Sequence, residues 1–323
     1  MNKQEFASRY INRRFYNISA IEKNDSSNKS NFSKIIKFLL KEKKPKWPNI
    51  INTKTPILKK LDELTPVITF INHSTFLIEI DNEKILIDPV FSNIVGPKNL
   101  LGVKRKRPPG LSIYELPKID LILITHNHYD HLDIKSLRII TRKFAPKIIV
   151  PLGNKNWLNK LNFNDIIEMD WGQCIKIYGL KIYFLPAQHH SGRGVLDHNK
   201  TLWGSFMICH KTINLFHAGD TGYAEHFKSI GKIFDIDLAL LPIGDYKPFW
   251  FEYMHMNPYD AVRAHLDLKS KQSFAMHHDT FPLSSVNYLE PEIDLAKALI
   301  KYNIKNNAFN ILKTGESYRY KIS

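Results

Sequence analysis

The segment from Thr125 to His131 contains four potential metal ligands within six residues. It directly follows the apolar run 121–124, which predicts a buried strand. Because alternate residues of an extended segment point to the same side, His126 and His128 can reach one ion, while Asp130 and His131 lie where a second ion can bind. Imidazole and carboxylate ligands without thiolate favour Zn²⁺ in an open, catalytic site. The alternative is a polar surface turn that is rich in histidine.

A loop this short cannot fill two coordination shells, so further ligands are expected where other strands end. Three apolar runs precede suitable residues: 182–185 before His189, 215–216 before Asp220, and 273–276 before His277. The gaps are 58 residues from His131 to His189, 31 from His189 to Asp220 and 57 from Asp220 to His277. Each gap has room for a strand and helix unit or a pair of hairpins. All three strand ends can therefore return to one edge of the fold.

The complete pattern resembles the metallo-β-lactamase superfamily, whose signature His-x-His-x-Asp-His followed by distant His, Asp and His is matched at every position. Residues 31–320 are more specifically similar to the N-acylphosphatidylethanolamine-hydrolysing phospholipase D branch (NAPE-PLD). The motifs that carry this closer resemblance are His126-Asn127-His128-Tyr129-Asp130-His131-Leu132-Asp133, Leu202-Trp203-Gly204-Ser205, Ala218-Gly219-Asp220-Thr221-Gly222-Tyr223, Pro242-Ile243-Gly244, Tyr288-Leu289-Glu290-Pro291 and Lys313-Thr314-Gly315-Glu316-Ser317. The resemblance implies a zinc-dependent phosphodiesterase that converts such phospholipids to N-acylethanolamine and phosphatidic acid.

The resemblance also implies a dinuclear zinc site with seven ligands. One Zn²⁺ is expected to be bound by His126, His128 and His189. The other is expected to be bound by Asp130, His131 and His277, and Asp220 is expected to bridge the two ions. Two carboxylates and a bridging hydroxide leave the pocket net positive, which suits an anionic phosphodiester. Zinc lowers the pKa of bound water toward about 7. We therefore expect in-line attack by hydroxide on phosphorus, without a covalent enzyme intermediate.

Several other polar residues are expected around the metals, each with a plainer alternative. The resemblance implies that His255 lies near the reacting phosphate and that His255 and Asp130 are catalytic residues. The alternative for His255 is a buried, hydrogen-bonded histidine. Arg193 resembles a phosphate-binding position, and its alternative is a solvated loop arginine. Tyr129 either hydrogen-bonds the substrate or packs.

Two further residues are expected to orient the metal ligands rather than to bind metal. His73 lies in a turn similar to the Gly-His-Ala-Thr turn of the branch, with asparagine in place of the glycine. Asp88 ends a strand and can hold a ligand histidine, or it is simply a turn carboxylate before a proline. The chain departs from the branch after His277, where His278 and Asp279 replace the usual Trp-Gly.

Strand-like and helix-like patterns alternate from Val67 to Tyr320 and predict an α/β protein. Helices are expected at Ile134–Phe144, Pro258–Leu268 and 291–302, the first of them capped by Asp133. Ligands at strand ends, helices outside and two similar halves indicate an αβ/βα sandwich. We assign residues 61–323 to this catalytic domain and residues 1–60 to a basic, partly helical and partly flexible N-terminal extension. The two cysteines, Cys174 and Cys209, are expected to be small buried residues.

The positive charge of the chain is concentrated at its N-terminal end. Residues 1–60 contain 15 Lys or Arg and 4 Asp or Glu, which gives +11 of the net +15 of the whole chain. Residues 31–41 form an amphipathic pattern that fits a helix on an anionic bilayer or, alternatively, a helix docked on the core. The basic run 104–107 is a second candidate for lipid contact. No apolar run is long enough to span a membrane, so a cytoplasmic protein, with peripheral membrane association through the N-terminal region, is the expectation.

Aromatic residues near the expected cleft suit a substrate with acyl chains. Phe249-Trp250-Phe251, together with Trp203 and Tyr246, are expected to form an apolar wall beside the metals, although aromatic residues more often fill cores. The alternatives are a nucleic-acid phosphodiesterase and a lactonase or sugar-phosphate hydrolase. No nucleic acid partner is expected, because no RNA-binding module is apparent. A homodimer is implied only by the resemblance.

Overall fold

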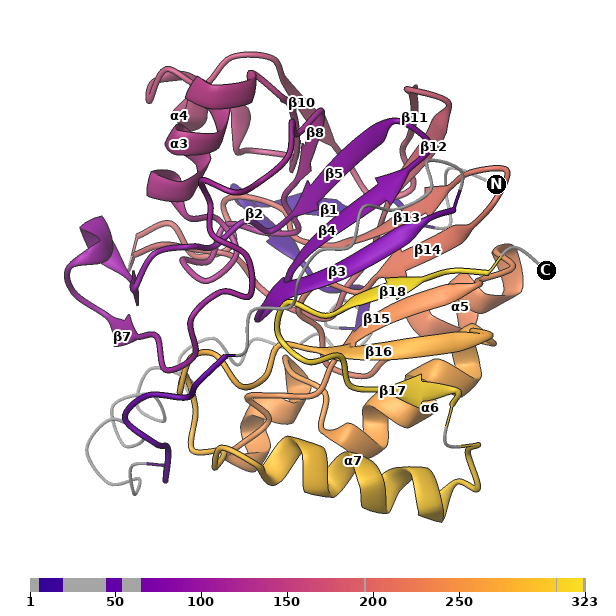
Figure 1. Ribbon diagram of the computed structural model, residues 1–323. Coiled ribbons are helices and arrows are strands. Elements are labelled where there is room, and N and C mark those ends of the chain that lie inside the picture. Colours follow the sequence, from indigo (N-terminus) through magenta and orange to yellow (C-terminus); the bar gives the residue numbers. More distant parts are fainter. Residues whose placement is uncertain (1–5, 20–44, 54–64, 195, 306, 322–323) are drawn as a thin grey trace.

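The computed structural model describes residues 6–19, 45–53, 65–194, 196–305 and 307–321, and these form a sandwich of two mixed sheets (Figure 1). The strand order of the first sheet is β10-β9-β8-β5-β4-β3-β18, and that of the second is β11-β12-β13-β14-β15-β16-β17. The bounds in the first sheet are β3 Val67–Asn72, β4 Thr75–Ile80, β5 Glu83–Ile87, β8 Leu121–Leu123, β9 Lys147–Pro151, β10 Ile166–Met169 and β18 Ser317–Arg319. Those in the second are β11 Cys174–Ile177, β12 Leu180–Leu185, β13 Ser205–Cys209, β14 Asn214–His217, β15 Leu238–Pro242, β16 Gln272–Met276 and β17 Phe309–Asn310.

Helices cover the outer faces of both sheets (Figure 1). The helices α3 (Ile134–Phe144) and α4 (Lys155–Asn159) pack on the first sheet, and α5 (His226–Ile233), α6 (Pro258–Leu268) and α7 (Glu290–Lys301) cover the second. The predicted helices at 134–144 and 258–268 are confirmed with these bounds, and the third begins and ends one residue earlier than expected. The side chain of Asp133 caps α3 by accepting from the backbone N–H of Lys135. The predicted α/β sandwich is therefore confirmed.

The strand directions bring the chemically important loops to one edge of the sandwich. In the first sheet, β5 is parallel to β8, and β3 runs in the same direction because two antiparallel pairings connect it to β5. In the second sheet, β14, β15 and β16 are parallel, and β12 matches them for the same reason. The carboxyl ends of parallel strands meet at one edge, where ligand sites of such sheets form.

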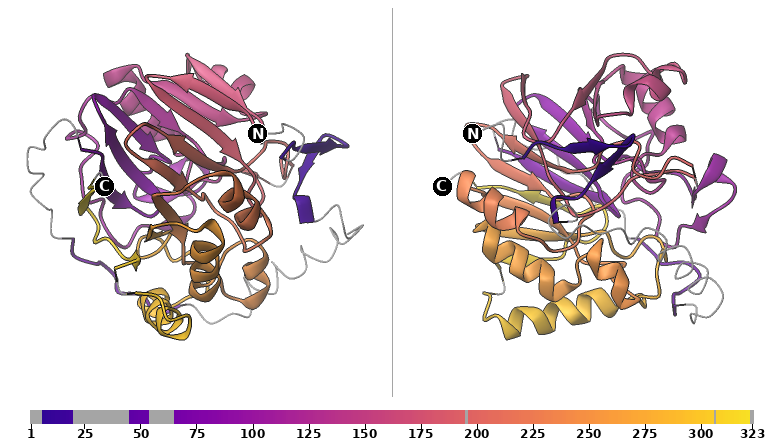
Figure 2. Two further views of the ribbon diagram at one scale, coloured as in Figure 1. Left: turned by 90° about the vertical axis from the view of Figure 1, so that its right-hand side faces the viewer. Right: turned by 180° about the vertical axis from the view of Figure 1, so that it is seen from behind.

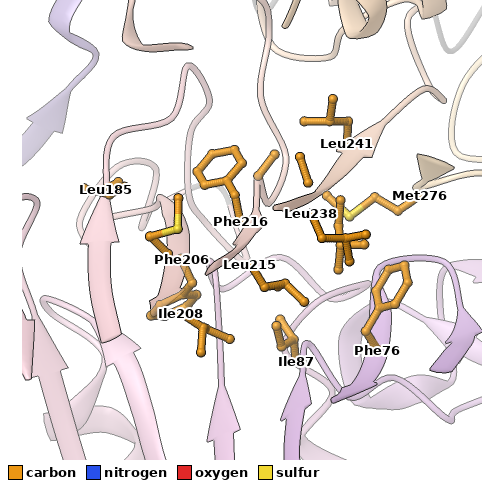
Figure 3. Close-up of a cluster of buried hydrophobic side chains, with 14 of the residues drawn as sticks. Phe76, Ile87, Leu185, Phe206, Ile208, Leu215, Phe216, Leu238, Leu241 and Met276 are labelled. Atoms are coloured by element: carbon orange, nitrogen blue, oxygen red, sulfur yellow. The ribbon is translucent and has the colours of Figure 1, made fainter. Parts of the chain in front are cut away.

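The main core fills the space between the two sheets. Figure 3 shows side chains from both layers meeting there, among them Phe76 and Ile87 from the first sheet and Phe216 and Met276 from the second. These four side chains are completely buried. Because burial of each large apolar side chain contributes roughly 1.5–3 kcal/mol, this core can hold the polar, strained edge in place.

The described part of the N-terminal segment packs against the sandwich. Residues 9–16 form a hairpin of β1 (Arg9–Ile11) and β2 (Arg14–Tyr16), which lies on the outside of the sandwich in both views of Figure 2. Phe6 and Phe15 are buried with the main core. The expected amphipathic helix at 31–41 and the expected flexible stretch lie outside the described residues. No helix in the described ranges is both long and apolar enough to cross a bilayer.

The prediction of two buried cysteines was wrong for Cys174, which is exposed on β11 at the edge of its sheet. Cys209 is half-buried on β13. The residues of β11 alternate between its two faces, and Cys174 shares the exposed face with Lys176. The apolar neighbours Ile175 and Ile177 therefore belong to the other face and give no information about Cys174.

A second hairpin projects near the metal loop. It consists of β6 (Ile94–Val95) and β7 (Val103–Lys104), joined through the 3-10 turn Pro97–Asn99. Its base is apolar: Val95 is buried in a small cluster with Phe281, and Val103 and Tyr129 pack against that cluster. At its tip, Leu100 and Leu101 are 72% and 74% exposed.

Candidate metal centre

The carboxylate of Asp88, directly after β5, fixes the loop that follows β8. One carboxylate oxygen accepts from the backbone N–H of Thr125 at 2.8 Å. The other accepts from the Thr125 hydroxyl at 2.6 Å and lies 2.8 Å from Nδ1 of His131. Asp88 is completely buried. Its contacts leave Nε2 of His131 directed away from it, which is the arrangement expected for a residue that orients a metal ligand.

The seven residues expected to bind metal all converge at this edge of the sandwich. Ligand atoms of His126, His128 and His189 lie within 4.8 Å of one another, as do those of a second set, His73, Asp130, His131 and His277. In the first set, Nδ1 of His128 is 2.9 Å from Nε2 of His126 and 3.2 Å from Nε2 of His189. The second set includes His73, which the sequence analysis expected to orient a ligand, so the assignment of individual ligands to two ions stays a prediction.

Asp220, which follows β14, lies between the two sets. Its Oδ2 is 3.2 Å from Nε2 of His131 and 3.0 Å from Nε2 of His277. The same oxygen is 3.8 Å from Nε2 of His126 and 3.7 Å from Nε2 of His189. One carboxylate therefore faces ligands of both sets, as a bridging ligand must.

The residues at this centre fit divalent cations. Nε2 of His131, Nε2 of His277 and Oδ1 of Asp220 are buried and have no hydrogen-bond partner in the described part of the chain. Buried polar atoms rarely remain without a partner, and three such atoms facing a common centre indicate a missing positive charge. The donor set of imidazoles and carboxylates is the one that open zinc sites use. These side chains can therefore hold metal ions.

The electrostatics of the centre favour a positive charge in the same place. Burial opposes ionisation of Asp220, but His131 and His277 outweigh it and hold the pKa of this carboxyl well below its usual range. Burial likewise opposes charge on His277, but Asp220 and Asp130 raise the pKa of His277 to about 10. A site that binds a proton this strongly also attracts a metal cation.

His255 lies at the rim of the centre, and its side chain is 15% exposed. Its Nδ1 is 3.9 Å from Oδ2 of Asp220, and burial lowers the pKa of His255 to about 4. Ligand atoms of His189, Asp220 and His255 also lie within 4.8 Å of one another. The geometry thus places His255 beside the ligands, where it can reach either a metal or a substrate.

His73 lies beside the second set, in the turn between β3 and β4. Its Nε2 is 3.1 Å from Oδ2 of Asp130, and its backbone carbonyl accepts from the N–H of His277 at 2.8 Å. The turn gives His73 a φ of 48°, a conformation that costs energy for a residue with a side chain. His73 is thus fastened to two of the expected ligands at once.

Arg193 and Tyr129 are fastened to the backbone of the metal loop. Nη1 of Arg193 donates to the carbonyls of Asn127 and Leu132, both at 2.8 Å. The Tyr129 hydroxyl donates to the carbonyl of Arg193 at 2.8 Å, and the guanidinium lies 3.9 Å from the centre of the Tyr129 ring. Both residues hold the loop, and their expected contact with substrate stays a prediction.

Two residues near the centre were given no role in the sequence analysis. Asn17 donates from Nδ2 to the carbonyl of His189 at 2.8 Å, and its Oδ1 accepts from the N–H of His189 at 3.0 Å. Asp245 is buried with Oδ2 at 3.4 Å from Nδ1 of His277, and burial raises the pKa of its carboxyl to about 6. Asp245 lies three residues after the end of the apolar strand β15, a placement similar to that of the expected ligands.

The expectation of an aromatic wall was wrong for two of its members. Trp203 is 1% exposed and its Nε1 donates to the carbonyl of Ala187, while Tyr246 is 3% exposed and its hydroxyl donates to Asp294. Both rings are part of the packed interior. Phe249 is 77% exposed, on the short 3-10 helix η3 (Phe249–Tyr253) that precedes His255.

The fold and the donor sets at its edge define a metal-dependent hydrolase, and the chain belongs to the metallo-β-lactamase superfamily, since residues 83–278 match the model of the beta-lactamase superfamily domain. Within it, the chain is 34% identical over 264 residues to N-acyl-phosphatidylethanolamine-hydrolyzing phospholipase D 1 of Caenorhabditis elegans, covering 77% of this chain and 74% of that protein. It is 37% identical over 280 residues to the mitochondrial N-acyl-phosphatidylethanolamine-hydrolyzing phospholipase D of Saccharomyces cerevisiae, covering 77% of this chain and 60% of that protein. A solved structure, the metallo hydrolase Igni18 of Ignicoccus hospitalis, is similar with a TM-score of 0.60 and 25% identity, covering 80% of this chain and all of that one.

Proposed function

We propose that this chain is a phospholipase D-type phosphodiesterase that hydrolyses N-acylphosphatidylethanolamine-like phospholipids to N-acylethanolamine and phosphatidic acid. The observation that carries the proposal is the placement of Asp220 between two sets of imidazole and carboxylate donors. Such a pair of sites suits a substrate that carries a negative phosphodiester. The similarity to two proteins named for this activity supports the lipid rather than another phosphodiester.

Two Zn²⁺ ions, held by His126, His128 and His189 and by Asp130, His131 and His277 with Asp220 between them, would supply an activated water and positive charge for the phosphate. Other residues of the chain hold these ligands in position. Asp88 and His73 fix the rings and the carboxylate that must point inward. His255 is placed at the rim to hydrogen-bond a phosphate oxygen through Nδ1, which has no hydrogen-bond partner among the described residues. The guanidinium of Arg193, near the loop, adds positive charge beside the same pocket.

We further propose that the substrate is met at an anionic membrane surface, with the β6–β7 hairpin as one contact. Leu100 and Leu101 protrude from its tip, and residues 89–114 contain no acidic residue. Lys98 and Lys104 are exposed on the hairpin. Each basic residue near an anionic bilayer contributes about 1 kcal/mol, and two inserted leucines add to this. Because the hairpin base packs with Tyr129 of the metal loop, lipid bound there lies near the centre.

A product assay on zinc-loaded protein tests the proposed activity. N-acylphosphatidylethanolamine in mixed micelles should yield equal amounts of N-acylethanolamine and phosphatidic acid. Asp220→Asn should abolish both products, since a neutral amide cannot bridge two cations as a carboxylate does, and the loss should be accompanied by reduced zinc content. A protein that binds zinc but releases neither product would rule out this substrate.

The same assay separates the alternatives that the sequence leaves open. Single-stranded RNA and a lactone are given to the wild-type protein under identical conditions. Cleavage of RNA with strong salt inhibition, and no turnover of phospholipid, would identify a nuclease instead. Turnover of the lactone alone would identify the lactonase alternative.

A further inference from the structure

Three side chains with metal-ligand atoms lie together next to, but outside, the centre described above. His278 and Asp279 follow the expected ligand His277, and Glu292 lies in the first turn of α7 (Glu290–Lys301). One ligand atom from each of the three residues lies within 4.8 Å of the other two. The cluster joins two segments, because the loop after β16 supplies the first two residues and α7 supplies the third.

Three buried atoms of this cluster have no hydrogen-bond partner among the residues that the structure describes. The side chain of His278 is 2% exposed, and neither of its ring nitrogens has a partner. Oδ1 of Asp279 is also buried and without a partner. Nδ1 of His278 lies 3.6 Å from Oδ2 of Asp279, which is too long for a hydrogen bond. The metal centre shows the same condition, with orphaned nitrogen and oxygen atoms facing one another.

The charged side chains around the cluster are compatible with a bound cation. Nη2 of Arg107 donates to Oδ2 of Asp279 at 3.0 Å and to the hydroxyl of Tyr288 at 2.7 Å. This guanidinium neutralises one of the two carboxylates and leaves Oδ1 of Asp279 free. Burial and the charge of Asp279 raise the pKa of Glu292, as expected for two carboxylates that lie close together.

The backbone of the loop holds these groups in a conformation that few residues tolerate. The φ angles of His277 and Asp279 are 57° and 60°, both in the left-handed region. Two such residues so close in sequence persist only where the surroundings over-determine them. A cross-link from Asp279 to α7 would stabilise this loop, and with it the position of His277.

We propose that His278, Asp279 and Glu292 bind a divalent transition-metal cation of the Zn²⁺ type, at a site separate from the dinuclear centre, which ties α7 to the loop that carries His277. One imidazole and two carboxylates form a donor set suited to Zn²⁺, Fe²⁺ or Mn²⁺. The role of this ion is structural, since three side chains of the protein and the packed Arg107 surround it. The proposal does not depend on which substrate the enzyme hydrolyses.

Metal content tests the proposal directly. The wild-type protein, Glu292→Gln and Glu290→Gln are loaded with Zn²⁺, desalted and analysed for zinc per chain. Glu290→Gln is the matched control, because it removes the same charge from the same helical turn, where Glu290 pairs with Lys247. We expect Glu292→Gln to bind one equivalent less than the wild type, and Glu290→Gln to bind the same amount as the wild type.

A second measurement keeps the test independent of the variants. Crystals of the zinc-loaded wild type should give an anomalous peak at the zinc edge between His278 and Glu292, apart from the peaks at the dinuclear centre. Equal zinc content in the wild type and Glu292→Gln, with no such peak, would overturn the proposal. That outcome would mean that a proton shared between Asp279 and Glu292 occupies the place assigned to the cation.

Discussion

Replacement of Asn17 by alanine should weaken the metal centre, although Asn17 contacts no metal ligand atom. The side chain pairs with both the N–H and the carbonyl of His189, and it also accepts from Nε1 of Trp203 at 3.2 Å. Trp203 retains the carbonyl of Ala187 as a partner, but the two backbone groups of His189 lose theirs. Since each unpaired buried polar group costs about 1–3 kcal/mol, the two groups together should lower the free energy of unfolding by roughly 2–6 kcal/mol.

The effect on metal binding follows from the same two bonds. Loss of an orienting partner typically lowers metal affinity by about 10- to 100-fold, so a zinc titration against a chelating dye should show one weakened site in Asn17→Ala. Ser19→Ala is the matched control, because its hydroxyl bonds only the side chains of Gln188 and Tyr253. Urea unfolding measures the stability of both variants. If Asn17→Ala kept the zinc affinity and the unfolding free energy of Ser19→Ala, the claim that the N-terminal segment positions His189 would be wrong.

Three further changes test other parts of the structure. Arg105→Met should cost about 3 kcal/mol or more in urea unfolding, because the buried carbonyls of residues 90 and 92 lose a charged donor; a value near zero would contradict this account. Burial lowers the pKa of His226 to about 3, whereas the ordinary histidine pKa is 6.5, so below pH 6.5 the unfolded state binds a proton that the folded state does not, and stability falls as the pH drops. Between pH 7 and 5, the wild type should therefore lose about 2 kcal/mol more in the free energy of unfolding than His226→Gln, and equal losses would refute this assignment. Gly244→Ala should reduce zinc content and stability, since a Cβ there would lie 1.9 Å from the carbonyl oxygen of His277, whereas Gly194→Ala, whose Cβ would meet nothing closer than 3.7 Å, should resemble wild type in both measurements.

The metal loop could be predicted from the sequence because its information is local. His126, His128, Asp130 and His131 follow a strand within a few residues, and the period of an extended chain already determines which side chains share a side. The placement of His189, Asp220 and His277 at the same edge follows the same rule, since each lies shortly after an apolar strand. The bounds of α3 were predicted for a similar reason, with a cap at Asp133 and one apolar face.

The contacts that were not predicted depend on tertiary structure. Asn17 lies 172 residues from His189, and nothing in its sequence neighbourhood distinguishes a buried amide from an exposed one. Trp203 and Tyr246 could not be assigned to the core or to a pocket wall, because either place suits an aromatic ring. The cluster of His278, Asp279 and Glu292 combines a loop with a helix that begins 11 residues later, and only the packing of α7 brings them together.

The pairing of β18 with β3 has a consequence for biosynthesis. Thr69 and Ser317, which share a hydrogen bond between their hydroxyls, are 248 residues apart. On the ribosome, β3 therefore emerges long before β18, the strand that pairs with its free edge. During that time the backbone donors and acceptors of this edge can pair with other chains. Mutations that slow synthesis or weaken Ser317–Arg319 should thus lower the yield of folded enzyme through aggregation of the nascent chain, without altering turnover by the molecules that do fold.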